Sequence, residues 1–256
     1  MGMKFSLIIR LSICAFALLA GQAGAGEISV LTTTWIPFAY EENGEAKGLS
    51  SEIVRSALDR AKITADIEFN SWNRAIITAK TRKNILIYPL MRIKEREKDF
   101  IWVAPIFNAK LSLFKLKKRK DIVIHSLADA KKYRIGVLKG AAMHQHLLSK
   151  GFKDNEQLQV FYSNRKSVEL LFRERVDLTA DNPLVVSYEI KQLNLSRPDI
   201  EPFSMDKVEE VLPFFESKAY MAFGRESSQE YATRLKAAMD SLKADGTLQK
   251  IFARYR

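Results

Sequence analysis

The sequence predicts an α/β protein made of two lobes, each a mostly parallel sheet flanked by helices, with two extended crossings between the lobes. Short apolar runs alternate with helix-like segments, which is typical of parallel sheets. The alternation occurs once before and once after an extended segment at 111–116 (LSLFKL). A second extended segment at 218–223 (KAYMAF) leads back, so the C-terminal residues are expected to return to the first unit.

The first unit begins with a predicted strand at 28–33 (ISVLTT), which is rich in β-branched residues. Asn43-Gly44 is a pair typical of turns. The following elements are expected in order: a helix at 50–61 with apolar residues on one face, a strand at 63–69, a helix at 72–80 and a strand at 85–90 (ILIYPL). A further apolar run, Phe100–Phe107, is expected to be broken at Pro105.

The second unit repeats this arrangement. Gly151 is expected to end its first helix, as a glycine just past a helix commonly does. The expected elements are a strand at 133–138, a helix at 141–150, a strand at 158–161, a helix at 167–173 and a strand at 176–180. A long amphipathic helix from Ser228 and a final helix at 247–255, opened by Asp245-Gly246, then close the chain.

Residues 1–25 are expected to be a secretory signal peptide. Lys4 and Arg10 precede or flank an apolar stretch, and Ala23-Gly24-Ala25 is a small-x-small cleavage site. The single cysteine, Cys14, lies inside this segment, so the exported chain is expected to have no disulfide. We therefore expect a periplasmic protein. We expect lobe I to comprise residues 26–112 and 218–256, and lobe II residues 113–217.

Charge and composition limit the partners. The formal net charge is +11, which favours anionic ligands or an anionic membrane nearby. Export removes the protein from nucleic acid, and the basic run Lys115–Lys120 (KLKKRK) is expected to be a solvated edge. His144 and His146 resemble a metal pair, but residues two apart on a helix point to different faces. We expect a monomer with no metal and no cofactor.

Two arginines follow the predicted strand at 85–90. Arg92 and Arg96 lie just beyond its end, in the segment YPLMRIKEREKDF. A guanidinium in such a place suits a carboxylate, because its planar fork donates two parallel hydrogen bonds. The alternative for either arginine is a solvated loop charge.

A series of short motifs occurs along the chain in a characteristic order. They are Trp35-x-Pro37-Phe38 with Tyr40, Gly48 before a helix with Glu52, Trp72 before a helix, Arg96 followed by Asp99-Phe100 and Pro105, Gly136-Val137 with Gly140, Val176-Asp177 leading to Asp181, and the tail LKAAMDSLKADGTLQKIFARY. In this order the chain resembles the family 3 extracellular solute-binding proteins, the periplasmic amino-acid-binding components of bacterial ABC importers. The resemblance implies a type II periplasmic-binding-protein fold.

The resemblance also implies a site between the lobes. The arginine at the position of Arg96 would hold the α-carboxylate of the ligand, and the aspartate at Asp181, on the other lobe, would hold its α-ammonium. Aromatics at Trp35 and Trp72 would wall the cleft. Further candidate contacts are Tyr40, Arg92, Gly140 and Ala141.

The chain departs from the family pattern on the side of the carboxylate. Ile93 stands where the family usually has Thr or Ser, and Ala141 stands where it has Thr or Ser after the glycine. Two hydroxyl donors are therefore missing, while Arg92 adds a cation nearby. We expect a divergent branch whose ligand is small and polar or anionic, an amino acid or a related compound.

The expected function is capture of this solute for an ABC permease or a membrane receptor, without catalysis. One alternative is a periplasmic enzyme on the same fold, similar to cyclohexadienyl dehydratase, for which Glu52 and Glu95 are candidate acids. Another is a sensory module that has lost its ligand.

Overall fold

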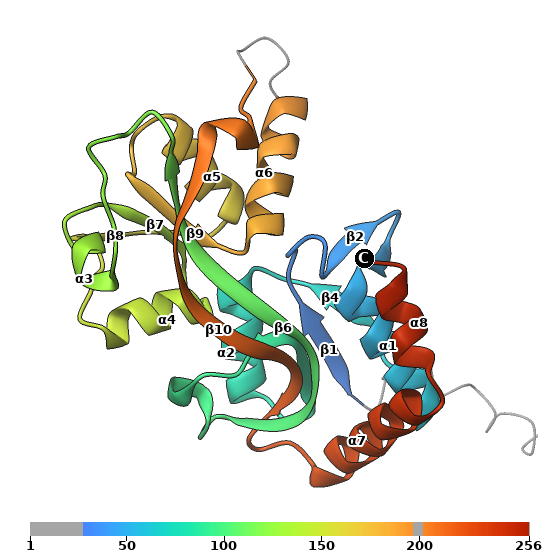
Figure 1. Ribbon diagram of the computed structural model, residues 1–256. Coiled ribbons are helices and arrows are strands. Elements are labelled where there is room, and N and C mark those ends of the chain that lie inside the picture. Colours follow the sequence, from blue (N-terminus) through green and yellow to red (C-terminus); the bar gives the residue numbers. More distant parts are fainter. Residues whose placement is uncertain (1–27, 197–201, 256) are drawn as a thin grey trace, which may run out of the picture.

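The structure is a computed structural model, and it describes residues 28–196 and 202–255. The expected signal peptide at 1–25 and Cys14 lie outside the described residues. Figure 1 shows two lobes with a pair of long strands running from one to the other, β6 (Phe100–Leu116) and β10 (Val208–Gly224). The predicted two-lobed α/β architecture is confirmed. No helix of the described segments has the length and apolar character needed to cross a membrane.

One twisted sheet of eight strands runs through both lobes in the order β4-β1-β5-β10-β6-β9-β7-β8. Its first-lobe strands, β1 (Ser29–Thr32), β4 (Ile67–Phe69) and β5 (Ile85–Met91), are parallel to one another. Its second-lobe strands, β7 (Ile135–Leu138), β8 (Leu158–Phe161) and β9 (Leu178–Asp181), are also parallel. The antiparallel pair β6 and β10 joins the two sets. The lobes therefore share a sheet, which the sequence did not reveal.

The prediction of a break at Pro105 is wrong, because β6 continues through it. Proline cannot donate a ladder hydrogen bond and is tolerated where one side of a strand is free. At Pro105 β6 pairs only with β10, since β9 reaches β6 only at 112–114. The prediction also missed the first half of β10, 208–217. Most of those residues are half-buried or exposed, and their short apolar run at 211–215 (VLPFF) contains a proline and is flanked by Glu210 and Glu216.

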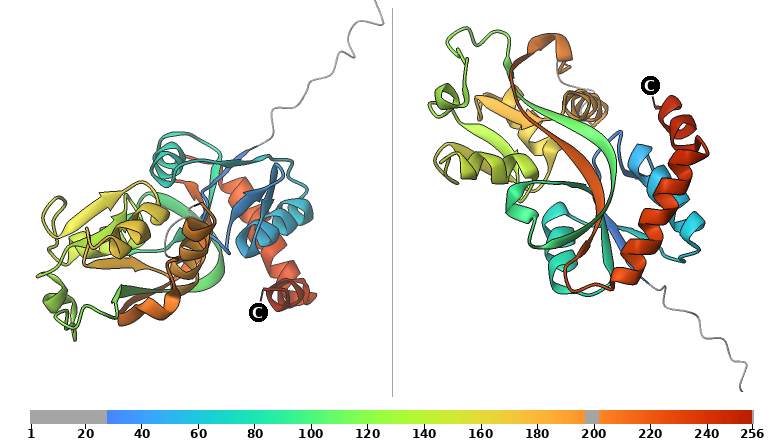
Figure 2. Two further views of the ribbon diagram at one scale, coloured as in Figure 1. Left: turned by 90° about the horizontal axis from the view of Figure 1, so that it is seen from above. Right: turned by 60° about the horizontal axis from the view of Figure 1, so that its bottom comes forward.

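Four helices cover the first lobe: α1 (Leu49–Ala61), α2 (Trp72–Thr81), α7 (Gln229–Ala244) and α8 (Thr247–Ala253). The C-terminal helices return to this lobe, where α7 and α8 pack beside α1 (Figure 2). On α1 the predicted apolar face is buried, with Ile53 and Val54 fully inaccessible. Asn43 and Gly44, both at positive φ, join the small hairpin of β2 (Tyr40–Glu42) and β3 (Glu45–Lys47), as the turn signal predicts.

The second lobe contains α3 (Leu127–Ala130), α4 (Ala142–Ser149), α5 (Asn164–Phe172) and α6 (Pro183–Leu195). Helix α6 was missed, although its start carries a clear signal. Asn182 is its N-cap and accepts a hydrogen bond from the Leu184 N–H, and Pro183 occupies the first turn. Two short 3₁₀ turns also occur in the described parts of the chain, η1 (Lys94–Arg96) and η2 (Met205–Lys207).

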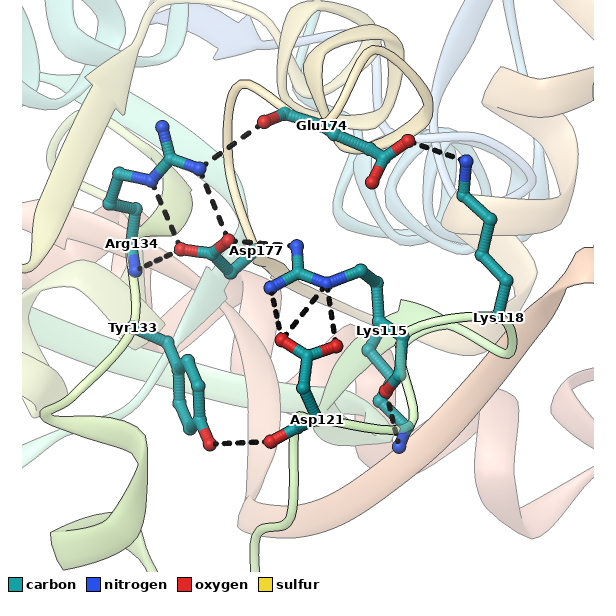
Figure 3. A network of polar contacts seen from close by, with 8 residues as sticks. Lys115, Lys118, Asp121, Tyr133, Arg134, Glu174 and Asp177 are labelled. Atoms are coloured by element: carbon teal, nitrogen blue, oxygen red, sulfur yellow. Dashed lines mark hydrogen bonds and ion pairs between the residues drawn. The ribbon is translucent and has the colours of Figure 1, made fainter.

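The basic run at 115–120 is solvated at Lys117, Lys118 and Lys120, as expected, whereas Lys115 and Arg119 belong to a network of polar contacts that includes several ion pairs (Figure 3). Lys115 is 7% exposed and donates to the carbonyls of Arg119 and Ile122. Arg119 and Arg134 both bind the carboxylate of Asp177, each at 3.0 Å. Burial alone would raise the pKa of Asp177, but hydrogen bonds from Arg134 and Arg119 outweigh it and hold the pKa at about 2. The run therefore stabilises one end of the second lobe.

Asp177→Asn is expected to lower the free energy of unfolding at pH 7 by about 1–3 kcal/mol, because it leaves Arg119 and Arg134 without their shared carboxylate. The folded pKa lies below the usual value, so this contribution is present above about pH 4 and is lost as the pH falls toward 2. Urea titrations of both proteins between pH 3 and pH 7 measure this. A difference between the two proteins that does not change with pH would contradict this explanation.

Candidate functional site

A cavity partly open to solvent lies where the lobes face each other, and the empty space there, about 470 Å³, includes solvent at its mouth. Residues near the carboxyl ends of β1, β5, β7 and β9 line it, the end of parallel strands at which α/β proteins commonly bind ligands. The lining residues are Thr33, Thr34, Trp35, Trp72, Pro89, Met91, Arg96, Leu111, Leu138, Ala141, Ala142, Met143, Asn164 and Asp181. Most are apolar, and Arg96 and Asp181 are the two charged residues among them.

Arg96 reaches the cavity from the 3₁₀ turn η1 and is only 3% exposed. Its Nη1 donates to the carbonyl of Met91 at 3.0 Å, and its Nη2 donates across the lobes to the carbonyl of Gly140 at 2.7 Å. The guanidinium also lies 5.7 Å from the ring centre of Trp72. Burial lowers the pKa of Arg96 to about 10, so it stays a cation at neutral pH.

Trp72 and Gly140 form a second link between the lobes. Trp72 begins α2 and donates from its indole Nε1 to the carbonyl of Gly140 at 3.0 Å, so this carbonyl accepts from both Trp72 and Arg96. The N–H of Gly140 is engaged as well, since it donates to Nδ1 of His144 at 3.1 Å. Nε2 of His144 in turn contacts Asp154 at 2.8 Å. His144 thus fixes the loop that carries Gly140, a role that the sequence did not suggest.

Asp181 ends β9 on the opposite wall and is 3% exposed. Its Oδ1 accepts hydrogen bonds from the N–H of Asn182 at 2.7 Å and from Nε1 of Trp35 at 3.4 Å. Burial raises the pKa of Asp181 to about 7, and the carboxylate of Glu189 adds to that rise. Trp35 also packs against Phe38, with ring centres 4.8 Å apart. The structure therefore brings five expected residues to one cavity: Arg96, Asp181, Trp35, Trp72 and Ala141.

Arg92 and Tyr40, which we expected near the ligand, do not line the cavity. The side chain of Arg92 is 41% exposed, binds Glu97 at 2.8 Å and lies over the rings of Trp102 and Tyr220. The turn η1 sends Arg96 inward and places Glu97 beside Arg92, so the two arginines take different sides. Tyr40 lies on the hairpin strand β2, where its backbone pairs with Lys47.

Other residues considered from the sequence lie elsewhere. Glu52 forms an ion pair with Arg254, and Glu95 lines an outer groove together with His146. Within the described parts of the chain no group of three or more acidic, histidine or cysteine side chains is placed to hold a metal ion. Several lining residues were missed, among them Thr33, Met91 and Asn164. Their positions at the end of a strand or at the start of a helix could have identified them as candidate ligand contacts.

Known proteins are similar to this chain along most of its length. The model of the bacterial extracellular solute-binding proteins, family 3, matches residues 28–256. A probable amino-acid-binding protein, YxeM of Bacillus subtilis (strain 168), is 22% identical over 223 residues, covering 86% of this chain and 79% of that protein.

Two solved structures share the fold. A histidine kinase sensor domain with similarity to periplasmic binding proteins superposes with a TM-score of 0.76 at 15% identity, covering 89% of this chain and 95% of that one. An ancestral arginine-binding protein bound to arginine superposes with a TM-score of 0.73 at 21% identity, covering 89% and 96%. At such identities the likeness shows the fold.

Proposed function

Because the chain belongs to the bacterial extracellular solute-binding proteins of family 3, we propose that it captures a small amino-acid-like solute between its lobes in the periplasm. It would then deliver the solute to an ABC permease or report it to a membrane receptor. The amino-acid-binding relative in Bacillus subtilis supports the class of solute.

The observation that carries this proposal is the pair of buried, opposite charges on facing walls of one cavity. Arg96 comes from the first lobe and Asp181 from the second, and each is 3% exposed. A site assembled from two lobes holds its ligand only when they come together, so binding and closure are coupled. We propose lobe I at 26–112 and 218–256 and lobe II at 113–217, with the middle of β6 and β10 as the hinge.

We propose binding by a monomer rather than catalysis. A dehydratase needs a general acid beside the leaving hydroxyl. Of the acids considered for this role, Glu52 and Glu95 lie outside the cavity. Turnover of prephenate or arogenate by the purified protein would overturn this part of the proposal.

A screen by thermal unfolding tests the function directly. Amino acids, amines, organic acids and oligopeptides are added one at a time, and the shift in melting temperature is measured. A true ligand at 100 times its dissociation constant is expected to stabilise the folded state by about 2.7 kcal/mol. The same compound should give no shift with a variant in which Trp35 and Trp72, which line the cavity, are both replaced by alanine. A library in which no compound shifts the melting temperature would contradict the proposal and favour a module without a ligand.

A further inference from the structure

The two charged residues of the cavity are buried, and neither forms an ion pair within the described residues. A guanidinium has five N–H groups, and only two of those of Arg96 have partners in the described parts of the chain, the carbonyls of Met91 and Gly140. Asp181 accepts hydrogen bonds from the neutral donors of Asn182 and Trp35. Under the proposed function, an amino-acid zwitterion supplies one charge to each of these two residues and uses up both.

The wall has no third charge for the side chain of such a solute, because the other residues that line the cavity are all neutral. Two further arginines of the first lobe lie outside it. Arg92 binds Glu97 at the surface, and Arg74 lines a separate outer pocket that shares only Thr33 and Thr34 with the cavity. A charged side chain buried in the cavity would therefore stay unpaired, which costs free energy.

The buried part of the wall is apolar on every side. Apart from Arg96 and Asp181, each lining residue that is buried has an apolar side chain or, at Trp72, an indole N–H that already donates to Gly140. Both lobes and the connecting strand β6 contribute, with Met91 from the first lobe, Ala142 and Met143 from the second, and Leu111 from β6. Such a wall favours a solute that brings apolar surface out of water.

None of the neutral polar residues of the wall is buried. Thr34 is exposed, and Thr33 and Asn164 are half-buried. Thr33 and Thr34 also line the outer pocket, and Asn164 begins α5. These side chains can form hydrogen bonds with the charged end of the solute or with water. They supply no charge for its side chain.

We propose that the solute is an α-amino acid with an apolar side chain, and that the walls of both lobes select against charged and amide side chains. This inference rests on the proposed function, because it names the solute of the same cavity. It narrows the small polar or anionic solute expected from the sequence. Arg92 lies outside the cavity, so once Arg96 holds the α-carboxylate no lining cation is left for a second anionic group.

Matched amino acids test the inference, because they keep the α-carboxylate and the α-ammonium and change only the side chain. Isothermal titration calorimetry at pH 8 compares leucine with aspartate and asparagine, methionine with glutamate and glutamine, and norleucine with lysine. The side chains within each set are similar in size. In each set that binds, the apolar member is expected to bind at least tenfold more tightly than the others.

The outcomes separate this inference from the proposed function. A charged or amide member that binds within tenfold of its apolar partner, or more tightly, would overturn the inference and leave the proposed function intact. The same holds if another compound of the thermal screen binds and none of these amino acids does. If nothing in the screen binds, both are overturned.

Opposite charges at one position of the wall separate recognition of the solute from effects on the fold. Leu138 ends β7, is half-buried and lines the cavity. Leu138→Glu is expected to raise the affinity for lysine relative to norleucine at least tenfold, because it supplies the missing negative charge. Leu138→Lys should do the same for glutamate relative to methionine.

Leu195 of the same lobe is 66% exposed and lies outside the cavity, so Leu195→Glu and Leu195→Lys are the matched controls and should keep the preferences of the wild type. Circular dichroism shows whether each variant is folded. Unchanged preferences in folded Leu138→Glu and Leu138→Lys proteins would overturn the inference, since the side chain of the solute would then not meet this wall.

Discussion

Asp181→Asn is expected to make the protein more stable at pH 8 in the absence of added solute, by on the order of 2–4 kcal/mol. Burial raises the pKa of Asp181 to about 7, far above the usual value of an aspartate. The folded state therefore binds the proton of Asp181 more tightly than the unfolded state does. This contribution to the free energy of unfolding is present below about pH 4 and is lost as the pH rises to about 7. Asparagine stays neutral throughout and still accepts hydrogen bonds from Asn182 and Trp35.

Urea titrations of both proteins at several pH values between 4 and 8 measure this effect. The two curves should meet near pH 4 and separate as the pH rises, with the variant above the wild type. Asp177→Asn is the matched control, since the same substitution there is expected to destabilise the protein at neutral pH. Equal stabilities of wild type and Asp181→Asn at pH 8 would show that the buried carboxylate carries no such cost.

Arg96→Met is expected to shift the lobes toward an open arrangement and to lower the free energy of unfolding by about 1–3 kcal/mol. The guanidinium of Arg96 donates within the first lobe to Met91 and across the cavity to Gly140. Methionine fills a similar volume but donates nothing, so of the two donors to the Gly140 carbonyl only Trp72 is left.

Fluorescence energy transfer between labelled cysteines reports the lobe separation. Lys236→Cys on α7 and Lys132→Cys in the second lobe are exposed labelling positions, with Cys14 replaced by serine. Transfer efficiency should fall in Arg96→Met. It should not change in Arg92→Met, the matched control, because Arg92 makes a surface ion pair with Glu97 outside the cavity. An equal transfer efficiency in Arg96→Met and Arg92→Met would contradict the role of Arg96 in holding the lobes together.

Local patterns predicted most of the fold. Alternating strands and helices, the apolar face of α1 and the turn at Asn43-Gly44 all came from residue spacing. The first half of β10 and its union with β6 could not be predicted in this way, because those residues are half-exposed and pair with a strand far away in the sequence. Helix α6 was missed despite its Asn182-Pro183 start, since its apolar pattern is not confined to one face.

The residues of the site could not be predicted from residue spacing alone. Spacing alone could not distinguish Arg92 from Arg96, because both follow the same strand and only the turn η1 directs one inward. The pairing of Arg96 with Asp181 came from the resemblance to a family, and the cavity has both on its walls. Arg96 and Trp72 donate hydrogen bonds to the carbonyl of Gly140, and the N–H of Gly140 donates to His144. These contacts could not be predicted from residue types, because every residue has the same backbone carbonyl.

A crystal structure of the protein with the compound that raises its melting temperature most is the most direct test of how this cavity works. We predict that the compound lies in the cavity between Trp35 and Trp72, with a positively charged group within about 3 Å of the carboxylate of Asp181, as in a charge-assisted hydrogen bond. A compound bound outside the cavity, or bound with no group near Asp181, would contradict the account.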